Sequence, residues 1–380
     1  MMPRAYQYPW MDESTEAFRD QVRRFLQAEI APRLEGWREQ GFIPRETWRH
    51  MGALGALLPE IPEQYGGSGV SLAYQLVVQD ELARAEVPAN VAVHAIVAHY
   101  ILDYGTEEQK RYWLPRLASG EDLAAIAMSE PGSGSDLKTL VTQARREGDE
   151  YVINGAKTFI TNGFTASVIL LACRTGGPDA KGISLIIMDT RNLPGFRSSR
   201  LKKIGQHASD TAELFFDEVR VPSSNLLGGE EGQGFGQLMS QLAFERMMLA
   251  VPAAATIDRA LELSVAHAKD RKMFDGKLFD LQNTRFKLAE VATTAHVVRS
   301  FVNDCTQRLV DGILDPQAAY MAKWWCTDQQ CKVVDECLQL FGGYGYMSEY
   351  PIARLYVDSR VQRIYGGANE VMKDLIARTL

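Results

Sequence analysis

The periodicity of apolar residues changes twice along this chain, and this order restricts the folds that it can adopt. From residue 12 to about residue 123, apolar residues recur at the three- and four-residue steps of helices, as at Val22, Phe25 and Leu26. From about Asp122 to Asn225, short β-type runs are separated by turn residues, with no helical pattern between them. Such strands favour an antiparallel barrel or sandwich. Because helical spacing then returns, the expected fold class is α+β, with a middle β domain between two helical domains.

The expected elements follow from these patterns. Helices are predicted after the capping residues DESTE and at 71–85, 90–105, 106–121, 237–271, 278–311 and 315–341. Strands are predicted at 124–130, 150–155, 157–163, 167–175, 182–189 and 211–222. The Pro- and Gly-containing segment 59–71 is expected to be a loop, and 226–236 a glycine-rich hinge. We therefore expect domains at residues 1–124, 125–231 and 232–380.

Composition excludes several classes of protein. The net charge of -7 and the pI near 5.5 provide no basic surface for nucleic acid. No apolar run approaches the length of a membrane span, and the N-terminus has the pattern of neither a signal peptide nor an organellar import signal. The cysteines are odd in number and scattered, which predicts reduced thiols and a bacterial cytoplasmic location; they are Cys173, Cys305, Cys326, Cys331 and Cys337.

Glu245 places a carboxylate in an otherwise apolar helical stripe. Leu238, Leu242 and Leu249 fall on one face of the helix predicted over 237–271, and Glu245 lies between the last two at the +3 and +4 offsets. Burial without a partner would raise the pKa of this carboxyl group, as suits a general base near neutral pH. The alternative is a structural glutamate that bends out to solvent or pairs with a cation.

Two segments of the middle region suit a flat or anionic ligand. In AMSEPGSGSDLK (127–138), Gly132 and Gly134 allow close approach of the backbone, and serine hydroxyls and exposed N–H groups add donors; an ordinary turn is the alternative. In INGAKTFITNG (153–163), Asn154-Gly155 predicts a hairpin turn. Phe159 and Thr161 then point to one side of the following strand, as an aromatic wall with a donor or as a core aromatic beside a surface threonine.

Two segments of the C-terminal region suit phosphates. HAKDRKMFDGKLFDLQ (267–282) holds Arg271, whose planar guanidinium matches phosphate oxygens; a solvated helix end is the alternative. The segment 339–378 holds the pairs Gly342-Gly343 and Gly366-Gly367, whose N–H groups suit a phosphate or a developing oxyanion. Helix termination by glycine is the competing explanation.

Three familiar sites are excluded. EPGSGSDLK lacks the third glycine and the βαβ context of a Rossmann motif. No Gly-Lys-Ser/Thr triplet marks a P-loop, and no Glu-x-x-His pair supports a di-metal helical bundle. No metal site is predicted.

Together, and in this order, these segments resemble the acyl-CoA dehydrogenase family over essentially the whole chain. The resemblance implies an N-terminal helical domain, a middle β-barrel or sandwich and a C-terminal four-helix bundle. It implies FAD as the cofactor, an acyl-CoA substrate, an electron-transferring flavoprotein as the acceptor, and a homo-oligomer, usually a tetramer.

The resemblance also assigns expected roles to residues. Residues flanking or reaching FAD are Ile126, Met128, Ser129, Gly134, Ser135, Phe159, Ile160, Thr161, Arg271, Phe274, Gln282, Gln339, Leu340, Gly342, Gly343, Ala368, Asn369 and Glu370. Arg271, Gln282 and the segment Gln339–Gly343 would reach the FAD of a neighbouring subunit. Residues expected to contact the acyl-CoA are Ser135, Ala243, Phe244, Arg246 and Gly367. Arg246 is expected either near the CoA end or paired with a carboxylate.

The chain departs from the family pattern at three places. Phe159 stands where many members have tryptophan, and Phe274-Asp275-Gly276 replaces Phe-Gly. Most importantly, Gly366 stands where most members carry the catalytic glutamate. In the long-chain and isovaleryl-type branches the base lies on the long helix before an arginine, which Glu245-Arg246 resembles. The tail IYGGANEVMKDLIAR is also most similar to the long-chain branch.

These observations predict oxidation of a fatty acyl-CoA to the trans-2-enoyl-CoA. Glu245 would remove the α-proton, and the N–H of Gly366, with a flavin ribityl hydroxyl, would stabilise the thioester oxygen. The expected substrate is long or methyl-branched, because in the family a base at 245 and not at 366 goes with such chains. The small residues of VPANVAVHAIVAHYIL would leave room for a long tail, or would serve close helix packing. The alternatives are an acyl-CoA oxidase, a flavin monooxygenase on the same fold and a non-catalytic acyl-CoA-binding homologue.

Overall fold

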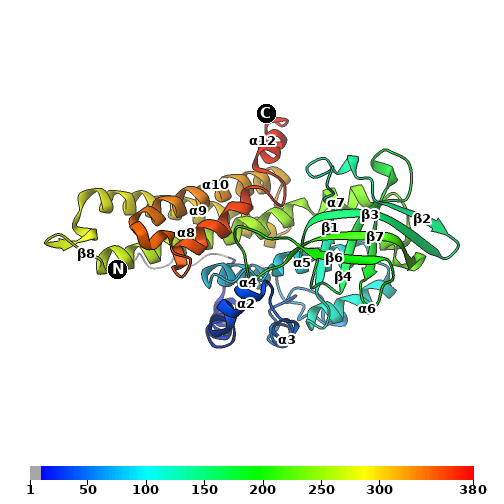
Figure 1. The fold of residues 1–380 in the computed structure, drawn as a ribbon, viewed down its shortest axis with the longest axis horizontal. Helices are drawn as coiled ribbons and strands as arrows, with labels where there is room; N and C mark the ends of the chain where they lie inside the picture. Colours follow the sequence, from blue (N-terminus) through cyan, green and yellow to red (C-terminus); the bar gives the residue numbers. More distant parts are fainter. Residues whose placement is uncertain (1–9) are drawn as a thin grey trace.

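The molecule has helical regions and one β region that lies at one end (Figure 1). The computed structural model describes residues 10–380. Residues 1–9 lie outside the described residues. They are part of the N-terminal segment for which the sequence predicts neither a signal peptide nor an import signal.

The N-terminal region is helical, as the sequence predicts. Its α-helices are α1 (Glu13–Phe25), α2 (Leu34–Gln40), α3 (Arg45–Ala53), α4 (Ala73–Arg84), α5 (Val91–Tyr104) and α6 (Glu107–Ala118). Asp12 caps α1 by accepting the N–H of Thr15, and Thr106 caps α6 by accepting the N–H of Gln109. Each cap is half of a capping box, which satisfies N–H groups that lack a partner within the helix. Thr106 therefore precedes α6 as its N-cap.

The β region is one seven-stranded sheet, with a strand order of β1-β4-β2-β3-β7-β6 and β5 paired to β4. Its strands are β1 (Ala124–Ala127), β2 (Gln143–Glu147), β3 (Glu150–Thr161), β4 (Val168–Arg174), β5 (Ile183–Asp189), β6 (Phe196–Arg200) and β7 (Thr211–Pro222). Most of the pairings are antiparallel, as expected, but β1 and β2 both pair with β4 in parallel. Apolar patterns locate strands without specifying their relative direction.

β4 explains why a run of the sequence is apolar at nearly every position. Val168, Leu170 and Ala172 pack into the core shared with the helices, whereas Ile169 and Leu171 pack into the core of the β domain. A strand covered on both faces needs apolar residues on both.

The predicted hairpin at Asn154-Gly155 is wrong. β3 runs unbroken through these residues and pairs with β7, with a register shift between Ile153 and Gly155. Asn154 instead bonds across to Glu218, donating from its side-chain amide and accepting the backbone N–H. The Asn-Gly pair marks a β-bulge, in which one strand carries an extra residue. β2 and β6 were not predicted, because QARRE and FRSSR are too polar to show a clear apolar pattern.

The C-terminal region is built around the 29-residue helix α8 (Leu242–Asp270). The helix predicted over 237–271 is interrupted: α7 (Gly234–Ser240) ends before Gln241, and α8 begins after it. The other helices are α9 (Gln282–Val310), α10 (Pro316–Leu340), α11 (Pro351–Ser359) and α12 (Asn369–Ala377). A small hairpin of β8 (Lys272–Met273) and β9 (Gly276–Lys277) joins α8 to α9.

A cluster of buried charges joins the N-terminal region to α8 and α9. Arg299 on α9 lies 2.6 Å from Asp80 on α4 and 2.6 Å from Asp258 on α8. Arg84 bridges the same two carboxylates at 2.9 and 2.7 Å. The two arginines hold the pKa of the Asp80 carboxyl well below its usual range, against the opposing effect of burial. Three helices from two regions are thereby fixed together.

Replacing Arg299 by methionine tests this cluster. The Arg299→Met variant leaves Asp80 with one of its bridging cations, and we expect the free energy of unfolding to fall by roughly 3 kcal/mol, the lower end for a broken buried pair. Chemical denaturation measures the loss. Arg308→Met on the same helix is the matched control, because the Arg308 pair with Asp304 is half exposed and should contribute less than ~1 kcal/mol. Equal losses in both variants would contradict the assigned role.

Candidate active site

Glu245 lies near the start of α8, with 6% of its surface exposed. Its Oε1 accepts a hydrogen bond of 2.9 Å from the Tyr100 hydroxyl, and its Oε2 lies 3.3 Å from Nη1 of Arg246. Burial raises the pKa of this carboxyl group, and Arg246 and Tyr100 partly oppose the increase. The side chain does not bend out to solvent, but it does pair with a cation. Of the predicted apolar stripe, Leu238 belongs to α7 and not to α8.

The glycine pair at 366 and 367 packs directly against this part of α8. A Cβ added to Gly366 would lie 2.3 Å from Cδ1 of Leu249, and Gly366 has a φ of +59°. A Cβ added to Gly367 would lie 3.3 Å from Nη2 of Arg246. The structure therefore brings the predicted residues Glu245, Arg246, Gly366 and Gly367 together. It also excludes a larger residue at 366 while Leu249 keeps its place.

Lys323 on α10 supports this loop and was missed from the sequence. It is fully buried, and its ammonium donates to the carbonyl of Gly367 at 2.5 Å and to Oδ1 of Asn369 at 2.9 Å. Burial and the nearby Arg246 lower the pKa of Lys323 to about 7. A lysine in an apolar helix, within AAYMAKWW, is the same kind of signal that marked Glu245.

Ala368 to Glu370 begin α12, with Ala368 as the N-cap. The Asn369 side chain is buried, and it donates to the carbonyl of Trp324 and the hydroxyl of Thr327 as well as accepting from Lys323. Its polar atoms are thus engaged within the protein, so the predicted cofactor contact of Asn369 depends on its backbone.

On the β side, a buried ion pair aligns the end of β1 with β3. Lys157 donates to the carbonyl of Met128 and to Oε1 of Glu130, both at 2.8 Å, and the N–H of Thr158 donates to the carbonyl of Ser129. Glu130 also accepts the N–H groups of residues 141 and 142. The pair therefore anchors the turn that carries Gly132, Gly134 and Ser135, all of which are exposed. Gly134 and Ser135 are predicted cofactor-binding residues.

Phe159 is not a core residue. Its side chain is 71% exposed and its φ is +60°, at a second register shift between β3 and β7. Ile160 is buried in the β core, Thr161 is partly exposed, and Ile126 is partly buried. An aromatic ring held outward in a rarely populated backbone conformation is typical of a functional site.

The remaining predicted cofactor residues lie elsewhere. Arg271 caps α8, and its guanidinium lies over the ring of Tyr344, 5.4 Å from the centroid. Tyr344 follows Gly342 and Gly343, at both of which an added Cβ would meet no atom within 4 Å. Gln339 and Leu340 end α10, and Gln282 begins α9. The left-handed Gly342 follows the end of α10, which agrees with its role in helix termination.

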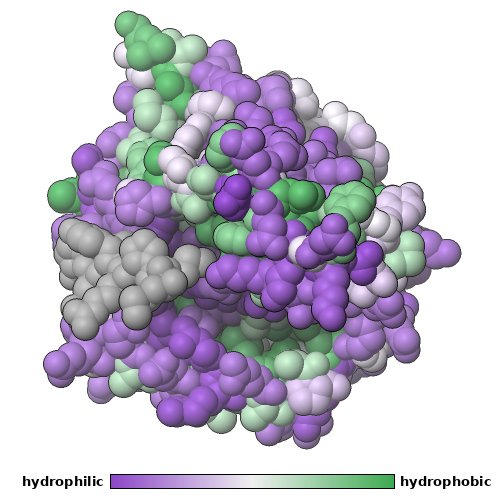
Figure 2. Space-filling model, turned by 90° about the vertical axis from the view of Figure 1, so that its left-hand side faces the viewer, coloured by the Kyte–Doolittle hydropathy of each residue, from purple (hydrophilic) through white to green (hydrophobic). Residues whose placement is uncertain are grey.

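The β8–β9 hairpin lies at the end of the molecule opposite the sheet (Figure 1). Phe274, in its two-residue turn, is 90% exposed. Figure 2 views this end and shows hydrophobic side chains scattered among hydrophilic ones. Within one chain, the hairpin that carries Phe274, with Arg271 just before it, is therefore far from the sheet that carries Phe159.

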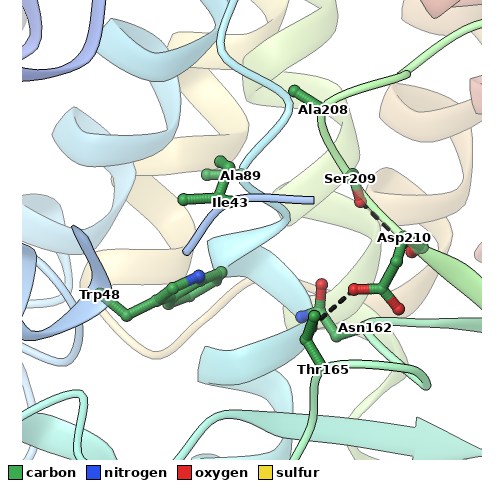
Figure 3. Close-up of a pocket in the computed structure, with 8 residues that line it drawn as sticks. All are labelled: Ile43, Trp48, Ala89, Asn162, Thr165, Ala208, Ser209 and Asp210. Carbon is green, nitrogen blue, oxygen red and sulfur yellow. Dashed lines mark hydrogen bonds between the residues drawn. The ribbon is translucent and has the colours of Figure 1, made fainter. Parts of the chain in front are cut away.

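Figure 3 shows a small cavity between the N-terminal helices and the sheet, lined by residues that include Trp48, Asn162 and Asp210. Its volume of about 10 Å³ is enough for about one water molecule, and far too small for a flavin or an acyl chain. Within residues 10–380, no cluster of His, Cys, Asp and Glu could hold a metal ion, and no helix is long and apolar enough to cross a membrane.

The helical, β and helical regions, with a buried glutamate facing a glycine loop, define the class of protein. The chain belongs to the acyl-CoA dehydrogenase family. It matches the N-terminal domain of that family over residues 12–121, the middle domain over 125–219 and the C-terminal domain over 232–380. It is therefore an FAD-dependent oxidoreductase that acts on CH–CH groups.

Individual relatives extend this assignment. The long-chain specific acyl-CoA dehydrogenase of Sus scrofa is 42% identical over 96% of this chain and 86% of the relative. An acyl-CoA dehydrogenase of Bacillus subtilis is 38% identical over 95% of this chain and 96% of the relative. The crystal structure of an acyl-CoA dehydrogenase from Geobacillus kaustophilus has a TM-score of 0.95 and 43% identity, covering 98% of this chain and 99% of that one.

Proposed function

We propose that Glu245 is the general base that removes the α-proton of an acyl-CoA thioester. The observation that carries the proposal is a buried carboxylate paired with Arg246, which itself lies against the loop in which Gly366 replaces the usual family base. Burial raises the pKa of Glu245, so its carboxylate is a stronger base than an exposed one. Arg246 lies 3.3 Å from one carboxylate oxygen, Oε2, and pairs with it.

The thioester oxygen must be stabilised, because an α-proton is too weakly acidic for an unaided carboxylate. The N–H of Gly366 is the proposed donor, and a backbone donor is unaffected by loss of the side chain. Lys323 donates to the carbonyl of Gly367, in the peptide between residues 367 and 368, and so restrains the loop that carries the donor. Gly367, Ala243, Phe244 and Ser135 are proposed to contact the substrate.

The residues present fit FAD. Phe159 is open to stack on a flat ring, and Gly132 and Gly134 leave space for close backbone approach. Met128, Ser129 and Thr161 lie beside them, and Ile160 contributes through its backbone. When bound, FAD accepts the β-hydrogen as hydride. Arg271 offers a guanidinium to the pyrophosphate, with Gln282, Gln339 and Gly342-Gly343 nearby.

We infer that the acyl chain is long or methyl-branched. The relative from Sus scrofa is named for long-chain substrates, and placing the base on α8 changes the shape of the pocket. Small and partly buried residues on α5, such as Ala92, are consistent with a long tail. Rates with straight, branched and terpenoid acyl-CoAs would compare the classes. An electron-transferring flavoprotein is the proposed acceptor, and cytoplasm the proposed location.

We also propose that the protein works as a homo-oligomer, with a tetramer expected. Support comes from the separation of Arg271 and Phe274 from Phe159 within one chain (Figure 1). A neighbouring copy would bring the two groups to one flavin. The exposed apolar side chains of Phe274 and Phe286 suit such a contact.

The Glu245→Gln variant tests the base. It keeps the size of the side chain and removes its basicity, so we expect flavin bleaching by acyl-CoA to slow by about 10²–10⁴-fold. Stopped-flow absorbance measures the rate. Glu262→Gln, a half-exposed position on the same helix, should bleach at the wild-type rate. Bleaching at that rate in Glu245→Gln would remove Glu245 from the mechanism, and oxygen uptake without an added acceptor would indicate an oxidase.

A second prediction concerns the position of the base. Gly366→Glu combined with Glu245→Gly should remain inactive, because the new Cβ would lie 2.3 Å from Leu249. Adding Leu249→Ala removes the obstructing carbon atoms, and we expect this triple variant to recover turnover. Glu245→Gly with Leu249→Ala is the control and should stay inactive. If the double variant already recovers, the loop adapts and Leu249 does not exclude a glutamate at 366.

Complementation between subunits tests the shared site. Glu245→Gln removes the base, and Arg271→Ala weakens the flavin site of a neighbour. Co-expressed chains should form some sites with both residues intact, so activity should exceed that of either variant alone. Mixing after separate purification, without exchange of subunits, is the control. Activity no greater than the sum of the two variants would place Arg271 at its own chain's flavin.

A further inference from the structure

Tyr100 connects the N-terminal region to the proposed base, and the chemistry described so far gives it no role. It lies on α5, 145 residues before Glu245, and its ring is completely buried. Its hydroxyl is 2.9 Å from Oε1 of Glu245 and 3.4 Å from the carbonyl oxygen of Leu238 on α7. One O–H group therefore has two acceptors, and the carboxylate is the nearer.

We propose that Tyr100 is a positioning residue for Glu245, holding its carboxyl group by a hydrogen bond in both of the protonation states through which it passes. The proposal rests on the proposed role of Glu245 as the base. Tyr100 touches neither substrate nor cofactor in this proposal, and it acts only through Glu245.

The geometry serves the ionised base first. A carboxylate only accepts hydrogen bonds, and a hydroxyl both donates and accepts. Before reaction, Tyr100 donates to Oε1 and Arg246 lies against Oε2. Both oxygens are thereby oriented, which keeps the carboxylate from rotating.

The same hydroxyl serves the protonated base. When the α-proton moves to Glu245, the carbon–hydrogen bond breaks and its electron pair remains with the substrate. The new carboxylic acid can donate its O–H to the Tyr100 oxygen. The Tyr100 proton can then turn to the carbonyl of Leu238, which already lies 3.4 Å away. No proton leaves Tyr100, and no buried donor is left without an acceptor.

The surrounding charges do not replace this contact. The titratable groups facing Glu245 and its partners are Tyr104 on α5, Arg246 on α8, Lys323 on α10 and Glu370 on α12. Of these, Arg246 acts directly on Glu245, while Lys323 interacts with Arg246 and with Glu370. Burial raises the pKa of the Tyr100 hydroxyl far above its ordinary value, so it is a donor at every working pH.

The Tyr100→Phe variant removes one oxygen atom and keeps the ring. The hydrogen bond from Tyr100 is stronger to the charged carboxylate than to the neutral acid. Its loss should therefore raise the pKa of Glu245 in the variant. The acid limb of the profile of kcat/KM against pH should therefore move to higher pH by about one unit. At pH values below the acid limb, kcat/KM of the variant should be about tenfold lower than that of the wild type. The affinity for a non-reacting acyl-CoA should be unchanged.

Tyr104→Phe is the matched control. Tyr104 lies one turn further along α5, and its hydroxyl pairs with Ser240. The Tyr104→Phe variant should lose this hydrogen bond, but the acid limb of its profile of kcat/KM against pH should not move. The proposal is overturned if Tyr100→Phe, with normal flavin content and thermal midpoint, has the wild-type profile, or if Tyr104→Phe shifts it equally.

A second replacement keeps the test decisive if Tyr100→Phe does not fold. Site-specific incorporation of a difluorinated tyrosine at position 100 makes the hydroxyl a stronger donor, so the acid limb should move to lower pH. An unmoved limb would reject the proposal. Wild-type bleaching in Glu245→Gln would instead reject the proposed base, so the two failures are distinguishable.

Discussion

The buried ion cluster of Asp80, Arg84, Asp258 and Arg299 is the interaction on which the arrangement of this molecule depends. It joins α4 to α8 and α9, and taking its charges out of water is offset only while each carboxylate faces an arginine. The next helix, α5, also contacts α8 and brings Tyr100 to Glu245, the proposed base.

A second constraint is the limited space between α8 and the loop before α12. Leu249 on α8 fills the volume that a side chain at 366 would need. A larger residue at 366 therefore requires the side chain of Leu249 to move. Lys323 on α10 stabilises the same loop by donating a hydrogen bond to the carbonyl of Gly367.

The flavin side depends on a different buried pair. Lys157 and Glu130 tie the segment after β1 to β3, and Phe159 follows two residues later at a bulge that turns it outward. These contacts join the segment that carries the exposed ring of Phe159 to the segment that carries the open glycine turn. At the far end of the molecule, the guanidinium of Arg271 lies over the ring of Tyr344, and Phe274 is exposed.

The sequence by itself determined the order of helical and β regions, the caps at Asp12 and Thr106, and the anomaly of Glu245 in an apolar stretch. These are local properties, because periodicity and capping depend on residues a few positions apart. Only the tertiary structure decided that Asn154-Gly155 is a bulge, that α7 and α8 are separate, and that β1 runs parallel to β4. It alone paired Glu245 with Tyr100 and Gly366 with Leu249. Such contacts join residues more than a hundred positions apart, and they depend on how whole elements pack, which no local pattern records.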